Sequence, residues 1–157
     1  MLIPAAVWLQ HWRGEQALGE LADLHVATLA SATNPVDVVS TDRHTVKPWF
    51  QGKLPFSFNL PEMQNSPLKL IGGRLAYFQQ SLGAQLLFEI RKHRISVFIF
   101  QNRAALSRLD SGSSLRKKLA FSSETWTEGG LRYFVVGDAT PSDVSDLSEH
   151  LKTAARS

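Results

Sequence analysis

The chain has 157 residues, of which 43% are apolar and 20% charged, and its formal net charge is +3. This length and composition favour one globular domain with its own core and exclude a wholly disordered chain. Lys and Arg are scattered along the chain, which argues against a nucleic-acid partner bound through phosphate contacts. The chain has no cysteine, which excludes disulfides, thiolate zinc sites and cysteine nucleophiles within it.

The first residues form an apolar stretch, Leu2–Leu9, that is too short to span a bilayer, which takes about 20 residues. No basic residues precede it, so a secretory signal peptide is a poor fit. Trp8 and Trp12, followed by Arg13, are typical of the interfacial end of a membrane helix. An ordinary amphipathic start to a soluble helix fits the same residues, and the sequence leaves both interpretations open.

A helix is predicted over residues 15–30, because Leu18, Leu21, His25 and Leu29 share one face at helical spacing. The segment 31–35 ends it, since the residue before a proline is pushed out of the helical region. His25 falls on or beside the apolar face. We interpret it as a packed, hydrogen-bonded histidine rather than a ligand.

The middle of the chain is predicted to form strands. After a short candidate at 36–40, strands are expected at 69–79, 84–91, 95–101, 117–127 and 131–137, with turns at 81–83, 91–94 and 128–130. Gly72 and Gly73 mark a bulge or a close backbone approach. Apolar residues on both faces of 84–101 predict a central place in the sheet, with a helix on one face and a loop, second helix or partner on the other. Residues 102–114 are expected to be a loop with a short helical turn at 104–109.

A C-terminal helix is predicted to begin with Thr140 as N-cap, Pro141 at its first position and Asp143 at its third. Its apolar stripe predicts that it reaches about Ala154. The expected fold class is therefore α+β: an N-terminal helix, an antiparallel meander of about five strands and a C-terminal helix. We expect the helices to lie on one face of the sheet.

The segment Asp42–Leu54 combines cations, aromatic residues, a proline and a glycine, with neither helical nor strand periodicity, and is expected to be irregular. One interpretation is structural, with its aromatic residues docking the segment onto the sheet. The other is a recognition site, in which Arg43, His44 and Lys47 face an anion or an acidic partner and Trp49 forms a wall.

Motifs for catalysis are missing from the sequence. There is no nucleophile elbow, no zinc-protease motif and no phosphate-binding glycine loop, and the five histidines are dispersed. Asp42 and His44 could form an acid–base pair, yet no nucleophile accompanies them. We therefore expect no catalytic residues, no metal, no cofactor and no enzymatic activity.

Four segments resemble a known family. They are Asp42–Leu54 with its Asp-Arg-His-Thr-Val-Lys-Pro-Trp-Phe core, the Gly-Gly-Arg-Leu strand at 70–75, the apolar hairpin at 86–100 and the Trp-x-x-Gly-Gly-Leu-x-Tyr hairpin at 126–133. Together they resemble the extracytoplasmic domain of bacterial transmembrane anti-sigma factors of the zinc-finger anti-sigma group. The resemblance covers about residues 15–155, and its first motif is the most specific.

The resemblance implies a longer protein. In that family a cytoplasmic domain with a His-x-x-x-Cys-x-x-Cys motif holds a sigma factor, and one transmembrane helix joins it to the outer domain. The cytoplasmic part and its cysteines are absent here, so sigma-factor binding is assigned to no residue of this chain. Residues 1–14 are then a residual membrane-proximal segment, and residues 15–155 are a single sensor-like domain.

The implied function is that of a periplasmic regulatory or sensor domain. Its protein would be anchored in the inner membrane by an N-terminal helix outside this chain and would control an extracytoplasmic-function sigma factor. The alternative is an envelope binding module for a small anionic ligand or a protein partner, and an enzyme is the least favoured hypothesis. The signal, the sigma factor, any protease site and the oligomeric state stay open, with a dimer among the possibilities.

Overall fold

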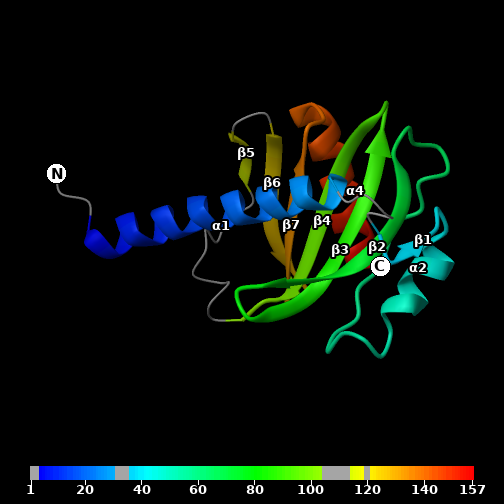
Figure 1. The fold of residues 1–157 in the computed structure, drawn as a ribbon, viewed down its shortest axis with the longest axis horizontal. Helices are drawn as coiled ribbons and strands as arrows, with labels where there is room; N and C mark the ends of the chain where they lie inside the picture. Colours follow the sequence, from blue (N-terminus) through cyan, green and yellow to red (C-terminus); the bar gives the residue numbers. More distant parts are fainter. Residues whose placement is uncertain (1–3, 31–35, 104–113, 119–120) are drawn as a thin grey trace.

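The computed structural model describes residues 4–30, 36–103, 114–118 and 121–157 (Figure 1). The α+β fold class is confirmed, with an N-terminal helix, one antiparallel sheet and a C-terminal helix. The helices are α1 Ala5–Leu29, α2 Arg43–Phe50 and α4 Pro141–Arg156. The strands are β1 Val38–Val39, β2 Lys69–Phe78, β3 Ser81–Ile90, β4 His93–Gln101, β5 Ser114–Lys118, β6 Phe121–Glu128 and β7 Leu131–Gly137.

The sheet has seven strands in the order β1-β2-β3-β4-β7-β6-β5, so it differs from a plain meander at one point. β4 is followed in the sheet by β7, while β5, the next strand in the chain, forms the far edge. This order places two strands with long buried runs side by side: β4 from Ile95 to Phe100 and all of β7 are buried. Central strands have both faces covered, which suits residues that are apolar on both sides.

Several predicted boundaries change. The single strand expected at 117–127 is two strands, β5 and β6. The β2–β3 turn is Gln79–Gln80 rather than 81–83, and Gly83 lies inside β3, where a Cβ atom would collide with the Ile99 carbonyl oxygen. The β3–β4 turn falls within the predicted 91–94 segment, at Arg91–Lys92. The helix stop expected at 31–35 and the helical turn expected at 104–109 lie outside the described residues.

Helices cover both faces of the sheet, which corrects the expectation of helices on one face (Figure 1). One face packs against α1 through Ala17, Leu18 and Leu21. The other face packs against α2, α4 and the segment between α2 and β2. The prediction of a second helix or loop on the other face of the central strands is thereby confirmed, because α4 and residues of 56–68 cover them.

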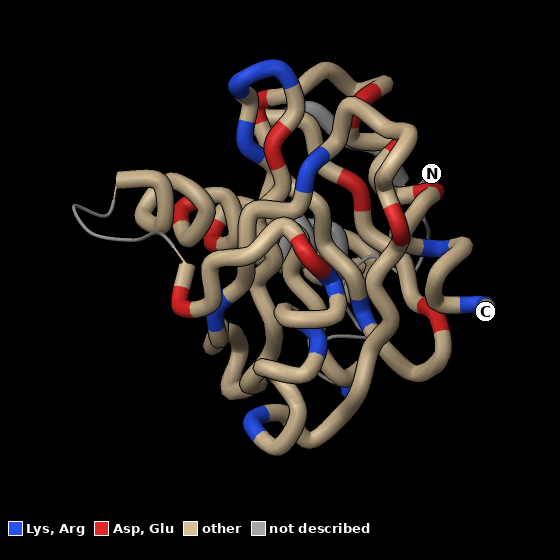
Figure 2. The backbone as a smooth tube through the Cα atoms, turned by 90° about the vertical axis from the view of Figure 1, so that its right-hand side faces the viewer, with Lys and Arg blue, Asp and Glu red and all other residues tan. Residues whose placement is uncertain are grey.

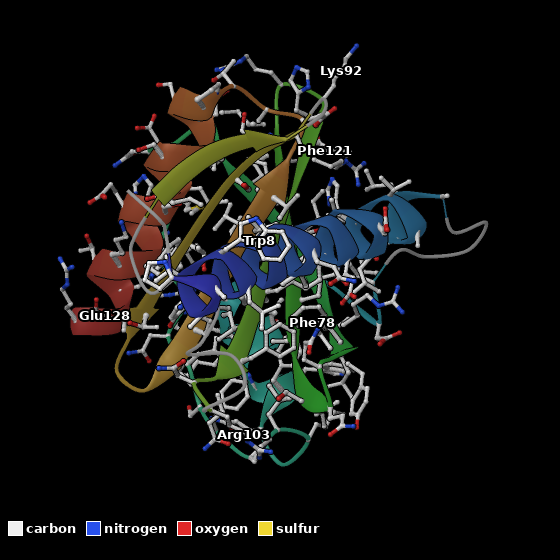
Figure 3. All side chains as sticks on the ribbon, turned by 90° about the vertical axis from the view of Figure 1, so that its left-hand side faces the viewer. Trp8, Phe78, Lys92, Arg103, Phe121 and Glu128 are labelled. Carbon is white, nitrogen blue, oxygen red and sulfur yellow. The ribbon has the colours of Figure 1, made fainter. Side chains whose placement is uncertain are left out.

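α1 begins at Ala5, earlier than the predicted start at residue 15, and its first described residues project from the body of the domain (Figures 1 and 3). Val7 and Trp8 are 53% and 63% exposed. Helical geometry starts after Pro4, whose carbonyl accepts hydrogen bonds from the backbone of Val7 and Trp8. Within the described part of the chain, no helix combines the length and apolar character needed to cross a membrane.

His25 is packed and hydrogen-bonded, as predicted. It is fully buried on α1, and its Nδ1 atom lies 2.6 Å from the Ser96 hydroxyl of β4. Gln85 of β3 donates to both Ser96 and Thr28, which completes a buried polar cluster between α1 and the sheet. Burial lowers the pKa of His25 from 6.5 to about 4, and the charge of Asp138 opposes this shift in part. The ring is therefore neutral near pH 7.

α4 begins as predicted. The side chain of Thr140 accepts a hydrogen bond from the backbone N–H of Asp143 at 3.1 Å, and Pro141 is the first helical residue. Val144, Leu147 and Leu151 are buried against the sheet. The opposite side of α4 is consequently free to line a surface feature, which is described below.

Candidate functional site

The segment expected to be irregular contains a helix, so that prediction was wrong. α2 runs over Arg43–Phe50, and Asp42 caps it: Oδ1 accepts from the backbone N–H of His44 at 2.8 Å. The helix buries only Val46 and Phe50, one turn apart. Two positions cannot establish a helical period in a sequence, and Pro48 inside the helix argues against one. These two facts explain why the pattern was missed.

α2 is anchored to the sheet through Phe50, which is 2% exposed and lies over Gly73 of β2. The neighbouring Gly72 faces β1, where a Cβ atom would collide with the carbonyl oxygen of Val38. A register shift between Leu70 and Gly72 marks a bulge at this point. The predicted bulge and close backbone approach at the two glycines are therefore both confirmed.

Trp49 belongs to this anchor. Its ring meets Phe50 edge to face with 4.9 Å between the ring centres, and the Lys53 ammonium lies 4.5 Å above it. Trp49 is partly buried and packs on the main core. It does not line the pocket formed by its neighbours on α2. The structural interpretation of the segment thus holds for Trp49 and Phe50.

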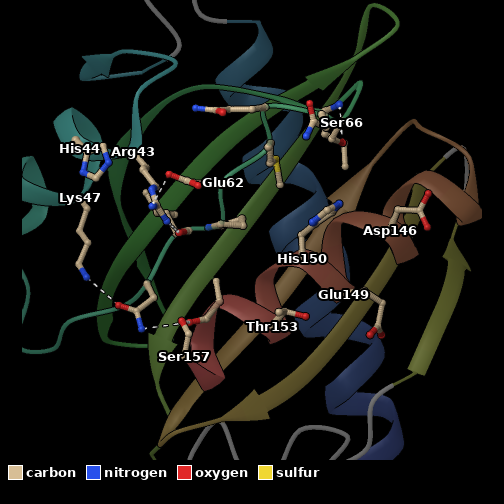
Figure 4. Close-up of a pocket in the computed structure, with 18 of the residues that line it drawn as sticks. Arg43, His44, Lys47, Glu62, Ser66, Asp146, Glu149, His150, Thr153 and Ser157 are labelled. Atoms are coloured by element: carbon tan, nitrogen blue, oxygen red, sulfur yellow. Dashed lines mark hydrogen bonds and ion pairs between the residues drawn. The ribbon is translucent and has the colours of Figure 1, made fainter.

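A pocket of about 1200 Å³ lies between α2, residues 59–68 and α4 (Figure 4). Three of the four predicted binding residues, Arg43, His44 and Lys47, line its α2 wall. The other wall comes from α4 and includes Asp146, Glu149, His150 and Thr153. A second pocket of about 460 Å³ adjoins it and shares Arg43 and His44.

Arg43 clamps the segment that follows α2. Its Nη1 atom donates to the Leu60 carbonyl at 3.0 Å and its Nη2 atom pairs with Glu62 at 2.7 Å. Its Nε atom is buried and has no hydrogen-bond partner in the described structure. Because two of its three nitrogens already hold the wall of the pocket, Arg43 is mainly a structural residue here.

Lys47 connects α2 to α4 through one side chain. Its ammonium donates to the Asn59 side-chain oxygen at 2.8 Å, and the Asn59 amide donates to the Ala154 carbonyl at 3.2 Å. Since an ammonium carries three donor hydrogens, Lys47 retains donors for a bound group. His44 is exposed, and its side chain forms no hydrogen bond or ion pair with the residues that the structure describes.

The α4 wall was not predicted from sequence. Its lining residues recur at 146, 149, 150, 153, 154 and 157, which is helical spacing on the side away from the buried stripe. This second, polar stripe is the signal that could have identified the wall. The sequence could not indicate that it would face α2, because that depends on how the two helices share one face of the sheet.

Catalytic or metal chemistry finds little support in the geometry. Asp42 is used as the N-cap, and no hydrogen bond joins its carboxylate to the His44 ring. Among the residues that the structure describes, no three His, Asp or Glu side chains are close enough to hold a metal ion. The lining of the pocket consists of charged, hydrogen-bonding and apolar side chains.

Comparison with models of known protein families finds no match to this chain. A search of curated proteins likewise finds no relative.

Proposed function

We propose that this chain is the periplasmic regulatory domain of a membrane-anchored anti-sigma factor that controls an extracytoplasmic-function sigma factor. The observation that carries the proposal is the contact between two of the family-like segments: Phe50 of the Asp42–Leu54 motif packs on Gly73 of the Gly-Gly-Arg-Leu strand. A Cβ atom at Gly73 would collide with the Phe50 ring, so the two segments depend on each other physically.

The fourth family-like segment supports the proposal in the same way. Trp126 of β6 lies opposite Tyr133 of β7, and their rings stack with 5.1 Å between centres and 6° between planes. Gly129 and Gly130 form the turn between the two strands, with φ values of +57° and +77°. Two residues with positive φ are what a tight hairpin of this kind requires, so each residue of the motif has a physical task.

The start of α1 agrees with an attachment at this end of the domain. Residues 4–9 are all exposed, at the end of a helix that projects from the body (Figure 1). Trp8 in this stretch is suited to the boundary between lipid and water. A membrane helix entering here would be continuous with the helix that packs on the sheet.

The test uses the full-length gene in its host. The proposal requires an upstream membrane-spanning stretch, a cytoplasmic zinc motif and a sigma factor released when the protein is deleted. A transcriptional reporter for that sigma factor should rise in the deletion strain and respond abnormally when only residues 15–155 are removed. A gene that lacks the upstream segments, or a reporter that is unchanged in both strains, would contradict the proposal.

A second function is an envelope binding module, which the pocket between α2 and α4 favours independently of any family. The pocket is large, and three of the residues singled out in the sequence, Arg43, His44 and Lys47, line it. Arg43 is largely committed to Leu60 and Glu62, so a purely anionic ligand would depend on Lys47 and His44. An enzyme stays the least favoured hypothesis, because no acid–base pair is formed by Asp42 and His44.

A further inference from the structure

The two walls of the pocket differ in charge. The α2 wall presents Arg43, Lys47 and the imidazole of His44, and the α4 wall presents Asp146, Glu149 and the imidazole of His150 (Figure 4). Both signs are also interspersed over the side of the molecule shown in Figure 2, with no large field of one sign. A site with this division is matched to a ligand that carries a positive and a negative group some distance apart.

Each wall retains capacity for a ligand. On the α2 side and among the described residues, Lys47 donates one hydrogen bond, to Asn59, and the His44 ring forms none. On the α4 side, Asp146 is exposed and forms no ion pair among the described residues. Glu149 is 67% exposed and its contact with Lys152 is long, at 3.4 Å. These groups can exchange water for a ligand without breaking a buried contact.

The floor and rim between the walls are rich in uncharged hydrogen-bonding groups. Asn59, Gln64, Asn65 and Ser66 line the pocket from the segment between α2 and β2. Amide side chains offer one acceptor and two donors, which matches the alternating C=O and N–H groups of a peptide backbone. The indole of Trp49 lies outside the lining, so the pocket offers no large flat surface on which a sugar ring would stack.

Size also favours more than a single small ion. The pocket has about 1200 Å³, compared with roughly 300–1000 Å³ for typical small-molecule sites. A lone anion would occupy a small part of that volume and would face the carboxylates of Glu62, Asp146 and Glu149. A lone cation would face Arg43 and Lys47 in the same way. A ligand with both a positive and a negative group would meet a group of opposite charge on each wall, whereas a lone ion would meet one on one wall only.

We propose that this pocket binds a short peptide, with the peptide carboxylate against Lys47 and His44 on α2 and the peptide ammonium against Asp146 and Glu149 on α4. The inference rests on the proposed function insofar as it names the class of signal that a sensor domain would detect. It deepens the binding-module alternative by replacing a purely anionic ligand with a zwitterionic one.

The test is isothermal titration calorimetry on the full 157-residue chain with four probes: trialanine, tetra-alanine, N-acetyl-trialanine and trialanine amide. At least one free peptide should bind at millimolar concentration or below. Acetylation and amidation should each weaken binding at least about tenfold, because each removes a charge-assisted hydrogen bond. Equal binding of all forms, or no binding of either free peptide, would overturn the proposal.

Two variants assign the walls. Asp146→Asn should weaken binding of the free peptide and reduce discrimination against N-acetyl-trialanine, because only Glu149 then faces the ammonium, while discrimination against the amide persists. Lys47→Gln should weaken binding of the free peptide and reduce discrimination against trialanine amide, while discrimination against N-acetyl-trialanine persists. If this variant does not fold, His44→Gln replaces it on the same wall. Asp23→Asn, an exposed position on α1 across the sheet, is the matched control and should bind like wild type. If Asp146→Asn instead lost discrimination against the amide, or Lys47→Gln lost discrimination against N-acetyl-trialanine, the proposed orientation of the peptide would be contradicted.

The outcome is separable from that of the proposed function. If the sigma-factor reporter behaves as proposed but no peptide binds, only the ligand assignment fails. If peptides bind with the expected discrimination but the gene has no anti-sigma segments, the pocket stands and the regulatory role fails.

Discussion

The ring of Phe50 lies over Gly73, where a Cβ atom would be 2.7 Å from the ring carbon Cζ. That separation is well inside van der Waals contact, and Phe50 is held from its other sides by Trp49 and Phe58. Neither residue can therefore change independently. This contact fixes the position of α2 on the sheet and, through α2, the basic wall of the pocket.

Gly73→Ala should destabilise the domain by about 1–3 kcal/mol, the usual cost of an added methyl group in a packed core. Chemical denaturation measures it. Phe50→Leu removes the ring, so Gly73→Ala should cost less in that background than in wild type. Equal costs in the two backgrounds would show that the ring and the glycine are not in contact.

Acidification should weaken the fold through His25. Its pKa is about 4 in the folded protein and 6.5 as the ordinary value, so the unfolded chain binds the proton more readily. Stability from this group is complete above about pH 6.5 and is lost as the pH falls toward 4, by up to about 3 kcal/mol.

The measurement is unfolding free energy against pH for wild type and His25→Gln. Carboxylates titrate over part of the same range, so the difference between the two curves isolates the histidine. That difference should shrink as the pH falls from about 6.5 toward 4. Parallel curves would show that the ring does not titrate differently on unfolding.

Asn59→Ala should loosen the link between α2 and α4. Two hydrogen bonds, from Lys47 and to Ala154, are lost, at about 0.5–1.5 kcal/mol each. Hydrogen exchange should accelerate at the last turn of α4 more than at its start. Gln64→Ala, at an exposed pocket position, is the control and should leave exchange in α4 unchanged.

Arg43 and Glu62 should differ in importance although they form one ion pair. Glu62 has a side-chain exposure of 58%, so Glu62→Gln should cost less than about 1 kcal/mol. Arg43→Ala also leaves the buried Leu60 without its hydrogen-bond donor, which costs about 1–3 kcal/mol. Equal losses in thermal denaturation would contradict the clamp assigned to Arg43.

Replacing the turn Gln79–Gln80 by Asn-Gly should stabilise the protein. Both glutamines have positive φ values, +51° and +60°, which cost L-residues about 1–2 kcal/mol each and glycine or asparagine less. A gain of about 1 kcal/mol in unfolding free energy is expected. The same substitution at exposed Gln64–Asn65 should offer no such gain, because neither of those residues has a positive φ.

The parts of the structure that follow from local rules were predictable from sequence. Thr140 and Pro141 define the start of α4 because capping depends on neighbouring residues alone. His25 was interpreted correctly because its place in a helical stripe implies burial. The strands expected within residues 84–101 could be predicted because side chains on alternate positions share one face of a strand and because β-branched and aromatic residues favour strands.

The parts that depend on distant contacts were not predictable. α2 packs on the sheet because Gly73 leaves room for the Phe50 ring. No residue near position 50 in the sequence indicates that partner. The place of β7 beside β4 depends on a non-local pairing. The α4 wall of the pocket, with Asp146 and Glu149, exists because two helices far apart in sequence lie on one face of the sheet.

The continuity of α1 has a mechanical consequence. At about 1.5 Å per residue, the helix from Ala5 to His25 is about 30 Å long; it projects from the body at its N-terminal end and packs on the sheet at the other. A shift by one residue would turn Leu24 or Val26 toward Ser96 and leave the hydroxyl and the Gln85 amide facing a hydrocarbon. Intermediate positions of α1 are therefore costly. A pull or twist at its N-terminal end leaves the helix either in place or detached as a whole from the sheet.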